Sequence, residues 1–238
     1  MKWIKDNTGR FSHRPYYMDD ELNNKCESII ISFLTEKYGS VSYPISTNDI
    51  TILIEQRTSH LDLFADLSNE GDNIEGMTVF ELNDLPKVFV SYMLSEISNL
   101  QNRLRTTLTH ELGHVVLHGP LLKNRQLSMF EDYNTPLVIK SNRNSFLNTK
   151  KIDWMEWQAG FASGAFLMPV MKLHDIFLER LKEYNLTGIQ STNSPFGREL
   201  IGETQKTFLV SSDAARVRLI QLGYLADLQG QQVEKELF

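Results

Sequence analysis

The sequence has little cysteine, no long apolar run and no excess of positive charge. Cys26 is the only cysteine among 238 residues, which excludes an intramolecular disulfide and favours a reducing compartment. The apolar runs, such as residues 29–31, are far too short to span a bilayer, and the N-terminus lacks the apolar stretch of a signal peptide. We therefore expect a cytoplasmic protein that does not enter a membrane.

The charge and the size narrow the class of protein further. A net charge of −6 argues against a dedicated nucleic-acid binder, which usually carries a basic footprint. The absence of internal repeats excludes solenoids, and a hydrophobic fraction of 41% suffices for a core. We predict one domain over residues 1–170 and a helical region over 171–238, in which two helices can take a helix-turn-helix-like form.

Periodicity predicts an α+β fold. Apolar positions at helical spacing predict a helix from Asp19 to Tyr38 with Gly39 as its stop, and the capping residues 46–49 predict a second, shorter helix. Rough alternation then predicts three strands of a small, mostly antiparallel sheet, over residues 60–67, 74–82 and 87–93. Helical spacing returns over residues 102–117 and 153–168, with short helices after 171. The polar stretch 119–152 predicts a loop with at most a short hairpin.

The helix predicted over residues 102–117 carries the sequence His110-Glu111-Leu112-Gly113-His114. Each helical residue advances about 100°, so His110 and His114 lie on one face and can reach the same zinc ion. Glu111, on the adjacent flank, can accept a proton from water instead of binding the metal. Gly113 leaves room for a closely packed neighbour. The pattern predicts the metal site of a peptidase.

A catalytic zinc needs a third protein ligand, for which His118, Asp153 and Glu156 are the candidates. Three ligands in a row on one helix cannot surround a tetrahedral ion, so His118 is either a supporting residue or a helix-end histidine that meets terminal carbonyls. Asp153 suits a helix N-cap. Glu156 begins a helix whose small residues, such as Ala159 and Ser163, allow close approach to the helix of His110, and we favour it over a solvated first-turn glutamate.

Several segments together resemble the ImmA/IrrE family of zincin-like metallopeptidases, and the resemblance covers most of the chain. It rests on Arg103 to His114 with Leu117-His118, on Glu156-Trp157-Gln158-Ala159 running to Pro169, and on segments near residues 75–78, 87–91 and 208–223. It implies a zincin-like fold, His110, His114 and Glu156 as zinc ligands, and Glu111 as the catalytic residue. Gly160 departs from the family, where an Asn is common.

The resemblance also implies a function. Members of this family often cleave or inactivate helix-turn-helix repressors of phages and mobile elements, while others act in stress responses or toxin–antitoxin pairs. We therefore expect a zinc-dependent endopeptidase whose substrate is such a repressor. In this mechanism Glu111 accepts a proton as water attacks the scissile carbonyl. Tyr133 is a candidate second oxyanion donor, and the strand at residues 87–92 is a candidate edge for a substrate backbone.

Three other interpretations remain open. The protein could keep the zinc site and regulate by binding without proteolysis, or it could be a metal-free structural module. Residues 198–222 could bind DNA through two helices, the second of which carries Arg216 and Arg218, although packing of these helices on the catalytic domain is the simpler interpretation. Two imidazoles and a carboxylate suit zinc, but they do not exclude manganese or iron.

Overall fold

The computed structural model describes residues 1–81, 83–125, 136–142 and 153–227. The chain divides into two compact units, of which the first comprises Met1–Pro169 and the second begins at Val170. The candidate metal ligands all belong to the first unit.

The first unit begins with an antiparallel hairpin of β1 (Lys2–Lys5) and β2 (His13–Tyr16), which the sequence patterns did not indicate. Helix α1 (Asp19–Tyr38) follows and ends at Gly39, whose φ of 75° is left-handed and whose N–H bonds to the carbonyl of Thr35. Helix α2 (Thr47–Glu55) begins after Ser46, whose side chain accepts from the N–H of Asp49. Both predicted helices are confirmed, because each carries its own stop or cap.

The sheet has four strands in the order β3-β5-β4-β6. The strands β3 (His60–Ala65) and β5 (Lys87–Ser91) are parallel, whereas β4 (Ile74–Phe80) pairs antiparallel with both β5 and β6 (Leu137–Asn142). The expected α+β class and mostly antiparallel sheet are therefore confirmed. The expectation that β5 offers a free edge is wrong, because β5 is paired on both sides, and β3 and β6 are the edge strands among the residues that the structure describes.

Helix α4 (Gln101–Arg125) follows the short helix α3 (Tyr92–Glu96) and a 3-10 turn at Ser98–Leu100. It extends well past the predicted end, with Pro120 inside it. Leu121 packs in a buried cluster with Phe80 and Trp154, and this burial outweighs the local stop signal of Gly119-Pro120. The loop predicted over 119–152 is thus partly helix and partly the strand β6, and residues 126–135 and 143–152 lie outside the described ranges.

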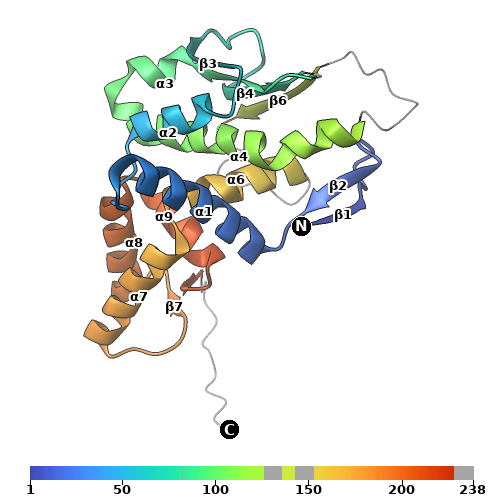
Figure 1. Ribbon diagram of the computed structural model, residues 1–238. Helices are drawn as coiled ribbons and strands as arrows, with labels where there is room; N and C mark the ends of the chain where they lie inside the picture. The colour runs from blue at the N-terminus through green and yellow to red at the C-terminus, as the bar shows by residue number, and fades with distance from the viewer. Residues whose placement is uncertain (82, 126–135, 143–152, 228–238) are drawn as a thin grey trace. The chain divides into compact units, whose positions relative to one another are not determined.

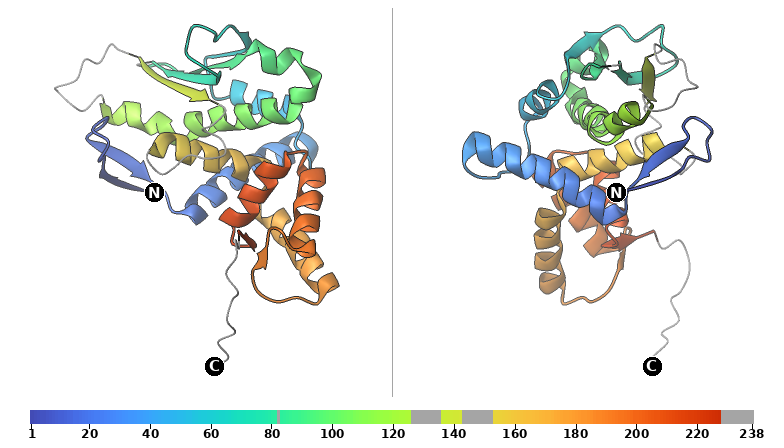
Figure 2. Two further views of the ribbon diagram at one scale, coloured as in Figure 1. Left: turned by 180° about the vertical axis from the view of Figure 1, so that it is seen from behind. Right: turned by 45° about the vertical axis from the view of Figure 1, so that its right-hand side comes forward.

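Helix α4 lies between the sheet and helix α6 (Trp154–Leu167), as Figures 1 and 2 show. The approach of the two helices depends on Gly113, because a Cβ there would lie 3.0 Å from the Cα of Ala159 and 3.2 Å from the Cβ of Ala162. The hydroxyls of Thr109 and Ser163 meet at 2.8 Å. The close packing that the small residues predicted is confirmed, and it brings two ligand-bearing helices within side-chain reach.

The second unit is mainly helical. Its elements are α7 (Val170–Tyr184), β7 (Gln190–Ser191), α8 (Pro195–Phe208), α9 (Ser212–Gln221) and β8 (Leu225–Ala226). Helices α8 and α9 follow the predicted order, but Arg218 is 1% exposed and Arg216 pairs with Asp227. Arg218 is therefore not an open phosphate contact, whereas the Arg216 side chain is 42% exposed.

Within the described ranges, no single helix is long and apolar enough to cross a membrane. Helices α6 and α7, taken together as one broken pair, do reach the length and composition of a span.

Candidate metal centre

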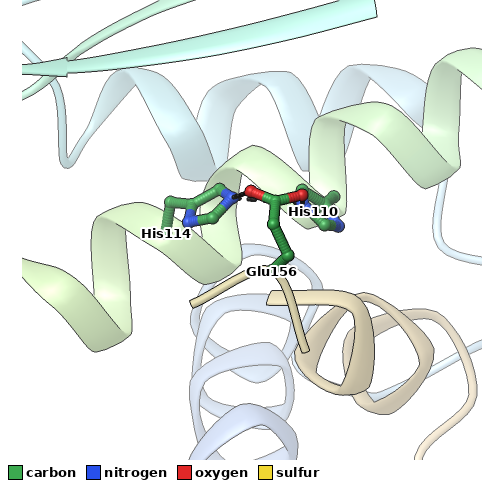
Figure 3. Close-up of side chains that lie close together, drawn as sticks. All are labelled: His110, His114 and Glu156. Atoms are coloured by element: carbon green, nitrogen blue, oxygen red, sulfur yellow. Dashed lines mark hydrogen bonds and ion pairs between the residues drawn. The ribbon is translucent and has the colours of Figure 1, made fainter. Parts of the chain in front are cut away.

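Three side chains from two helices converge in the interior of the first unit (Figure 3). The Nε2 atoms of His110 and His114 lie 3.1 Å apart. Glu156 places Oε2 at 3.3 Å from Nε2 of His110 and Oε1 at 3.2 Å from Nε2 of His114. Both histidines are fully buried and Glu156 is 7% exposed. The structure therefore brings together the three residues that the sequence proposed as ligands.

These separations match the requirements of a small metal ion. Zinc bonds to imidazole and carboxylate atoms at about 2.0–2.1 Å, so neighbouring ligands of a tetrahedral site lie roughly 3.3 Å apart. The three contacts just given fall close to that value. Three electron-rich atoms facing one point in a buried site also need a cation or shared protons between them. The His110, His114 and Glu156 cluster can thus hold a metal ion, and two imidazole nitrogens with a carboxylate suit zinc.

Local structure fixes the direction of Glu156. Asp153 caps α6, since its side chain accepts from the N–H groups of Met155 at 3.1 Å and Glu156 at 3.4 Å. Asp153 also pairs with Arg10 through two contacts of 2.8 and 3.2 Å. The N-cap role expected for Asp153 is confirmed, and the first turn of α6 presents Glu156 to the histidines of α4.

Glu111 lies on the other flank of α4, against the sheet. The hydroxyl of Thr78 on β4 donates to Oε2 of Glu111 at 2.6 Å. Its Oε1 atom is buried without a hydrogen-bond partner among the described residues. A Cβ on Gly76 would lie 2.2 Å from that Oε1 atom, so only glycine leaves space for the carboxylate there.

The two buried carboxylates differ in their pKa values. Burial raises the pKa of Glu111 to about 7, although His114 and the hydroxyls of Thr78 and Ser141 act in the opposite direction. Burial also acts to raise the pKa of Glu156, but its contacts with the imidazoles of His110 and His114 outweigh burial and hold that pKa well below its usual range. The environment therefore keeps Glu156 anionic and makes Glu111 a group that can exchange a proton near neutral pH.

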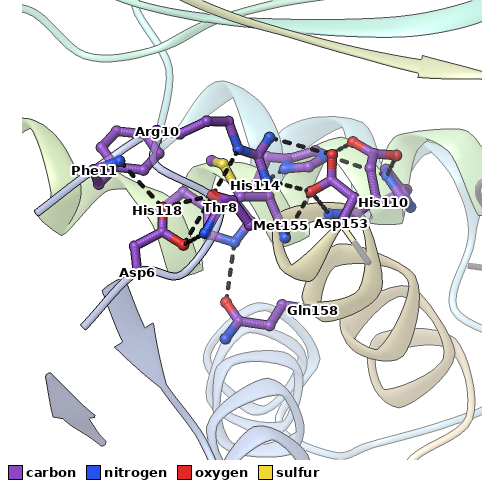
Figure 4. A network of polar contacts seen from close by, with 11 residues as sticks. Asp6, Thr8, Arg10, Phe11, His110, His114, His118, Asp153, Met155 and Gln158 are labelled. Carbon is purple, nitrogen blue, oxygen red and sulfur yellow. Dashed lines mark hydrogen bonds and ion pairs between the residues drawn. The ribbon is translucent and has the colours of Figure 1, made fainter. Parts of the chain in front are cut away.

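His118 is fully buried and stands outside the ligand cluster. Its Nδ1 atom lies 3.0 Å from Nδ1 of His114, and its Nε2 atom lies 3.1 Å from Oε1 of Gln158 (Figure 4). Burial lowers the pKa of His118 well below its ordinary value. Of the two interpretations left open by the sequence, the supporting residue is correct, because His118 contacts side chains and not the carbonyls of a helix end.

A cavity of about 310 Å³ lies beside Glu156. Its walls come from the β1–β2 loop at Arg10 and Phe11, from residues 137–140 of β6, and from the start of α6 at Asp153, Met155 and Glu156. The edge strand next to the metal ligands is thus β6 and not the predicted strand at 87–92. Tyr133, the candidate oxyanion donor, lies outside the described residues.

Sequence reasoning assigned no role to several side chains that surround the ligands. These are Gly76 and Thr78 on β4, Ser141 on β6 and Gln158 on α6. A glycine inside a strand signals a close approach of another group, and Gly76 could have been singled out on that ground. Ser141, whose Oγ lies 3.5 Å from Nε2 of His114, and Gln158 have no comparable signal.

No protein-family model matches the chain, and no curated protein matches it at a significant level.

Proposed function

We propose that the protein is a zinc-dependent endopeptidase with its active site on α4 and α6. The observation that carries the proposal is the convergence of His110, His114 and Glu156 at ligand spacing, with the carboxylate of Glu111 on the neighbouring flank. This is the donor set of a catalytic zinc site with three protein ligands, which leaves one position for water or substrate. A bound zinc ion would supply Lewis acidity, polarising a carbonyl and lowering the pKa of water.

Side chains of the protein would then bind the metal and transfer the protons of the reaction. His110, His114 and Glu156 would hold the metal, and the cavity beside Glu156 would admit water to it. Glu111 accepts the proton of the attacking water on Oε1, because Oε2 already accepts from Thr78. It then passes that proton to the leaving amine. The pKa of about 7 suits a group that both takes and returns a proton.

The cavity favours an extended peptide as substrate. The strand β6 lines it and pairs with β4 through one edge only among the described strands. An extended peptide can pair with such an edge through main-chain hydrogen bonds and pass its backbone next to Glu156. The resemblance of the motif segments to the ImmA/IrrE family supports a helix-turn-helix repressor of a phage or mobile element as the protein that is cut, and hence a role in transcription regulation.

The test compares wild type with Glu111→Gln, which keeps the size of the side chain and removes its basicity. Purified zinc-loaded proteins are incubated with candidate repressors encoded beside this chain, and the products are identified by mass spectrometry. Wild type is expected to give discrete fragments, and Glu111→Gln is expected to retain one zinc per chain and lose about 10²–10⁴-fold in rate.

The outcomes separate the alternatives. Full activity of Glu111→Gln would contradict the mechanism. Stoichiometric zinc without cleavage, together with repressor binding that survives in Glu111→Gln, would establish the regulatory alternative, in which the protein acts by binding. Absence of zinc from protein purified without chelators, and failure to bind added zinc, would refute the metal site itself.

A further inference from the structure

His114 belongs to a chain of polar contacts that leads from the metal cluster to the N-terminal hairpin, and Figure 4 shows its part from His114 through His118 to Gln158. Nδ1 of His114 lies 3.0 Å from Nδ1 of His118, and Nε2 of His118 lies 3.1 Å from Oε1 of Gln158. Nε2 of Gln158 in turn donates to the carbonyl of Pro15 at 3.0 Å. His114, His118 and Gln158 are at most 1% exposed, so no bulk water competes for these contacts.

The chemistry of its far end determines the direction of every proton in this chain. The carbonyl of Pro15 only accepts, so the amide nitrogen of Gln158 must face it, and the amide oxygen must face His118. That oxygen also only accepts, so Nε2 of His118 carries the proton. A neutral His118 ring then has its lone pair on Nδ1, and the proton between the two rings must belong to Nδ1 of His114.

We propose that His118, Gln158 and the carbonyl of Pro15 form a positioning chain that fixes His114 as its Nδ1–H tautomer and directs its Nε2 lone pair at the metal. His118 and Gln158 are thus positioning residues, because they act through His114. The inference rests on the proposed metal site. It also links the metal affinity to the hairpin, since the chain ends on β2.

The contact between His114 and Glu156 limits what can lie between their facing atoms. In the Nδ1–H tautomer, Nε2 of His114 bears a lone pair and faces a carboxylate oxygen at 3.2 Å. Two acceptors at that distance repel each other unless a cation or a shared proton lies between them. A metal ion there would accept both lone pairs, and ligand histidines commonly donate their other N–H to a neighbouring acceptor.

The first measurement is the tautomer of His114 in the metal-free protein, from the ¹⁵N chemical shifts of the imidazoles at about pH 9, where ordinary imidazoles are neutral. Wild type is expected to show a protonated Nδ1 and an unprotonated Nε2. Proton occupancy on Nε2 and not on Nδ1 would overturn the proposal, and this readout does not require peptidase activity or bound zinc.

The second measurement is zinc affinity, by competition with a chromophoric chelator. His118→Leu removes the acceptor and is expected to weaken zinc binding about 10–100-fold, and Gln158→Met, which keeps the length and removes the amide, about 10-fold. His118→Asn restores an acceptor near the position of Nδ1 and is expected to recover most of the affinity. Trp154→Phe is the matched control, because Trp154 packs edge-on against the His118 ring without a place in the chain.

These outcomes distinguish the inference from the proposed function. If wild type binds zinc and His118→Leu binds it equally well, the positioning chain is refuted while the metal site stands. If His118→Asn and Trp154→Phe lose as much affinity as His118→Leu, His118 acts only through packing and the inference fails. If wild type binds no zinc, the proposed function fails, and the tautomer measurement still decides whether His114 is held as described.

Discussion

A buried carboxylate lies on each of two sides of helix α4, and the two environments shift its pKa in opposite directions. The sheet side consists of Gly76, Thr78 and Ser141 around Glu111, and it leaves one carboxylate oxygen without a hydrogen-bond partner among the described residues. The helix side consists of α6 and β2, and it places Glu156 against two imidazoles.

Both carboxylates are buried, yet the pKa of Glu111 is raised to about 7 and that of Glu156 is held well below its usual range. The difference teaches that burial alone does not decide what a carboxylate does, since the neighbouring groups determine which protonation state is stable. The sheet side suits a group that exchanges protons, and the helix side suits a permanent anion that holds a cation. A substitution on one side of α4 therefore tests whether the two sides act independently.

Removing the carboxylate of the helix side should give the largest effect. Glu156→Ala deletes one of the three proposed ligands, and structural zinc sites gain on the order of 3 kcal/mol per ligand, or about 10²-fold in affinity. We expect zinc binding to weaken by at least about that factor, as measured by chelator competition. Glu36→Ala, an exposed glutamate on α1 of the same unit, is the control. Equal zinc affinity in the two variants would remove Glu156 from the site.

Gly76→Ala should displace the carboxylate of Glu111 on the sheet side of α4 and leave the metal ligands in place. Its Cβ would lie 2.2 Å from Oε1 and 2.7 Å from Cδ of Glu111, so the carboxylate has to move. Misplacement of a reacting group by about 1 Å can cost about 10²-fold in rate, and we expect such a loss in kcat with zinc affinity retained.

The control for Gly76→Ala is Gly119→Ala, because a Cβ at Gly119 meets no atom within 4 Å. If Gly76→Ala lost its zinc as well, the two sides would not be independent.

Thr78→Val removes the hydroxyl that donates to Glu111 and should change the pH dependence of the reaction. The hydroxyl lowers the pKa of Glu111, so its loss raises that pKa further. Glu111 has to be deprotonated to accept a proton, and the acid limb of the kcat/KM profile should therefore move to higher pH. We expect about a 10-fold loss of rate near pH 6 and a smaller loss near pH 8.

Thr58→Val serves as the control for Thr78→Val, because the Thr58 hydroxyl, just after α2, donates to the carbonyl of Ile54 in the last turn of that helix. An acid limb that shifted to lower pH in Thr78→Val would contradict the role of this hydroxyl.

The smallest effect is expected for the exposed ion pair at the start of α6. Arg10 and Asp153 form an ion pair whose side chains are 41% and 40% exposed, and exposed pairs contribute at most about 1 kcal/mol. Arg10→Gln should lower the free energy of unfolding by less than that and leave zinc affinity unchanged. Asp153→Ala also removes the α6 cap, and it should cost about 1 kcal/mol more in urea denaturation. Equal stability of the two variants would argue against the cap.

Elements whose signals lie within a few residues of them could be predicted. The start of α2 at Ser46 and the end of α1 at Gly39 depend on caps that a local window contains. The predicted end of α4 was wrong, because the helix continues to where Leu121 is buried in a cluster with Phe80 and Trp154. Both of these partners lie outside any such local window. The hairpin of β1 and β2 and the strand β6 were missed because their pairing partners are not visible in their own short sequences.

The site also combines a feature that local spacing predicts with one that depends on residues far apart in the sequence. The spacing of His110 and His114 is a property of one helix, and the backbone period alone places both rings on one face. For the third ligand the residues left three candidates, of which small neighbours and the resemblance favoured Glu156. The structure brings Glu156 to the histidines and excludes His118 from their cluster.

The sequence by itself determined which helix carries the metal motif, that its two histidines lie on one face of that helix, and which residue types could bind zinc. Only the tertiary structure decided that Glu156 meets those histidines, that Gly76 and Thr78 enclose Glu111, and that His118 lies in contact with both His114 and Gln158. The physical reason is that helical spacing follows from bond geometry over a few residues. The pairing of distant side chains depends on which surfaces the whole unit buries together, and no local pattern records that choice.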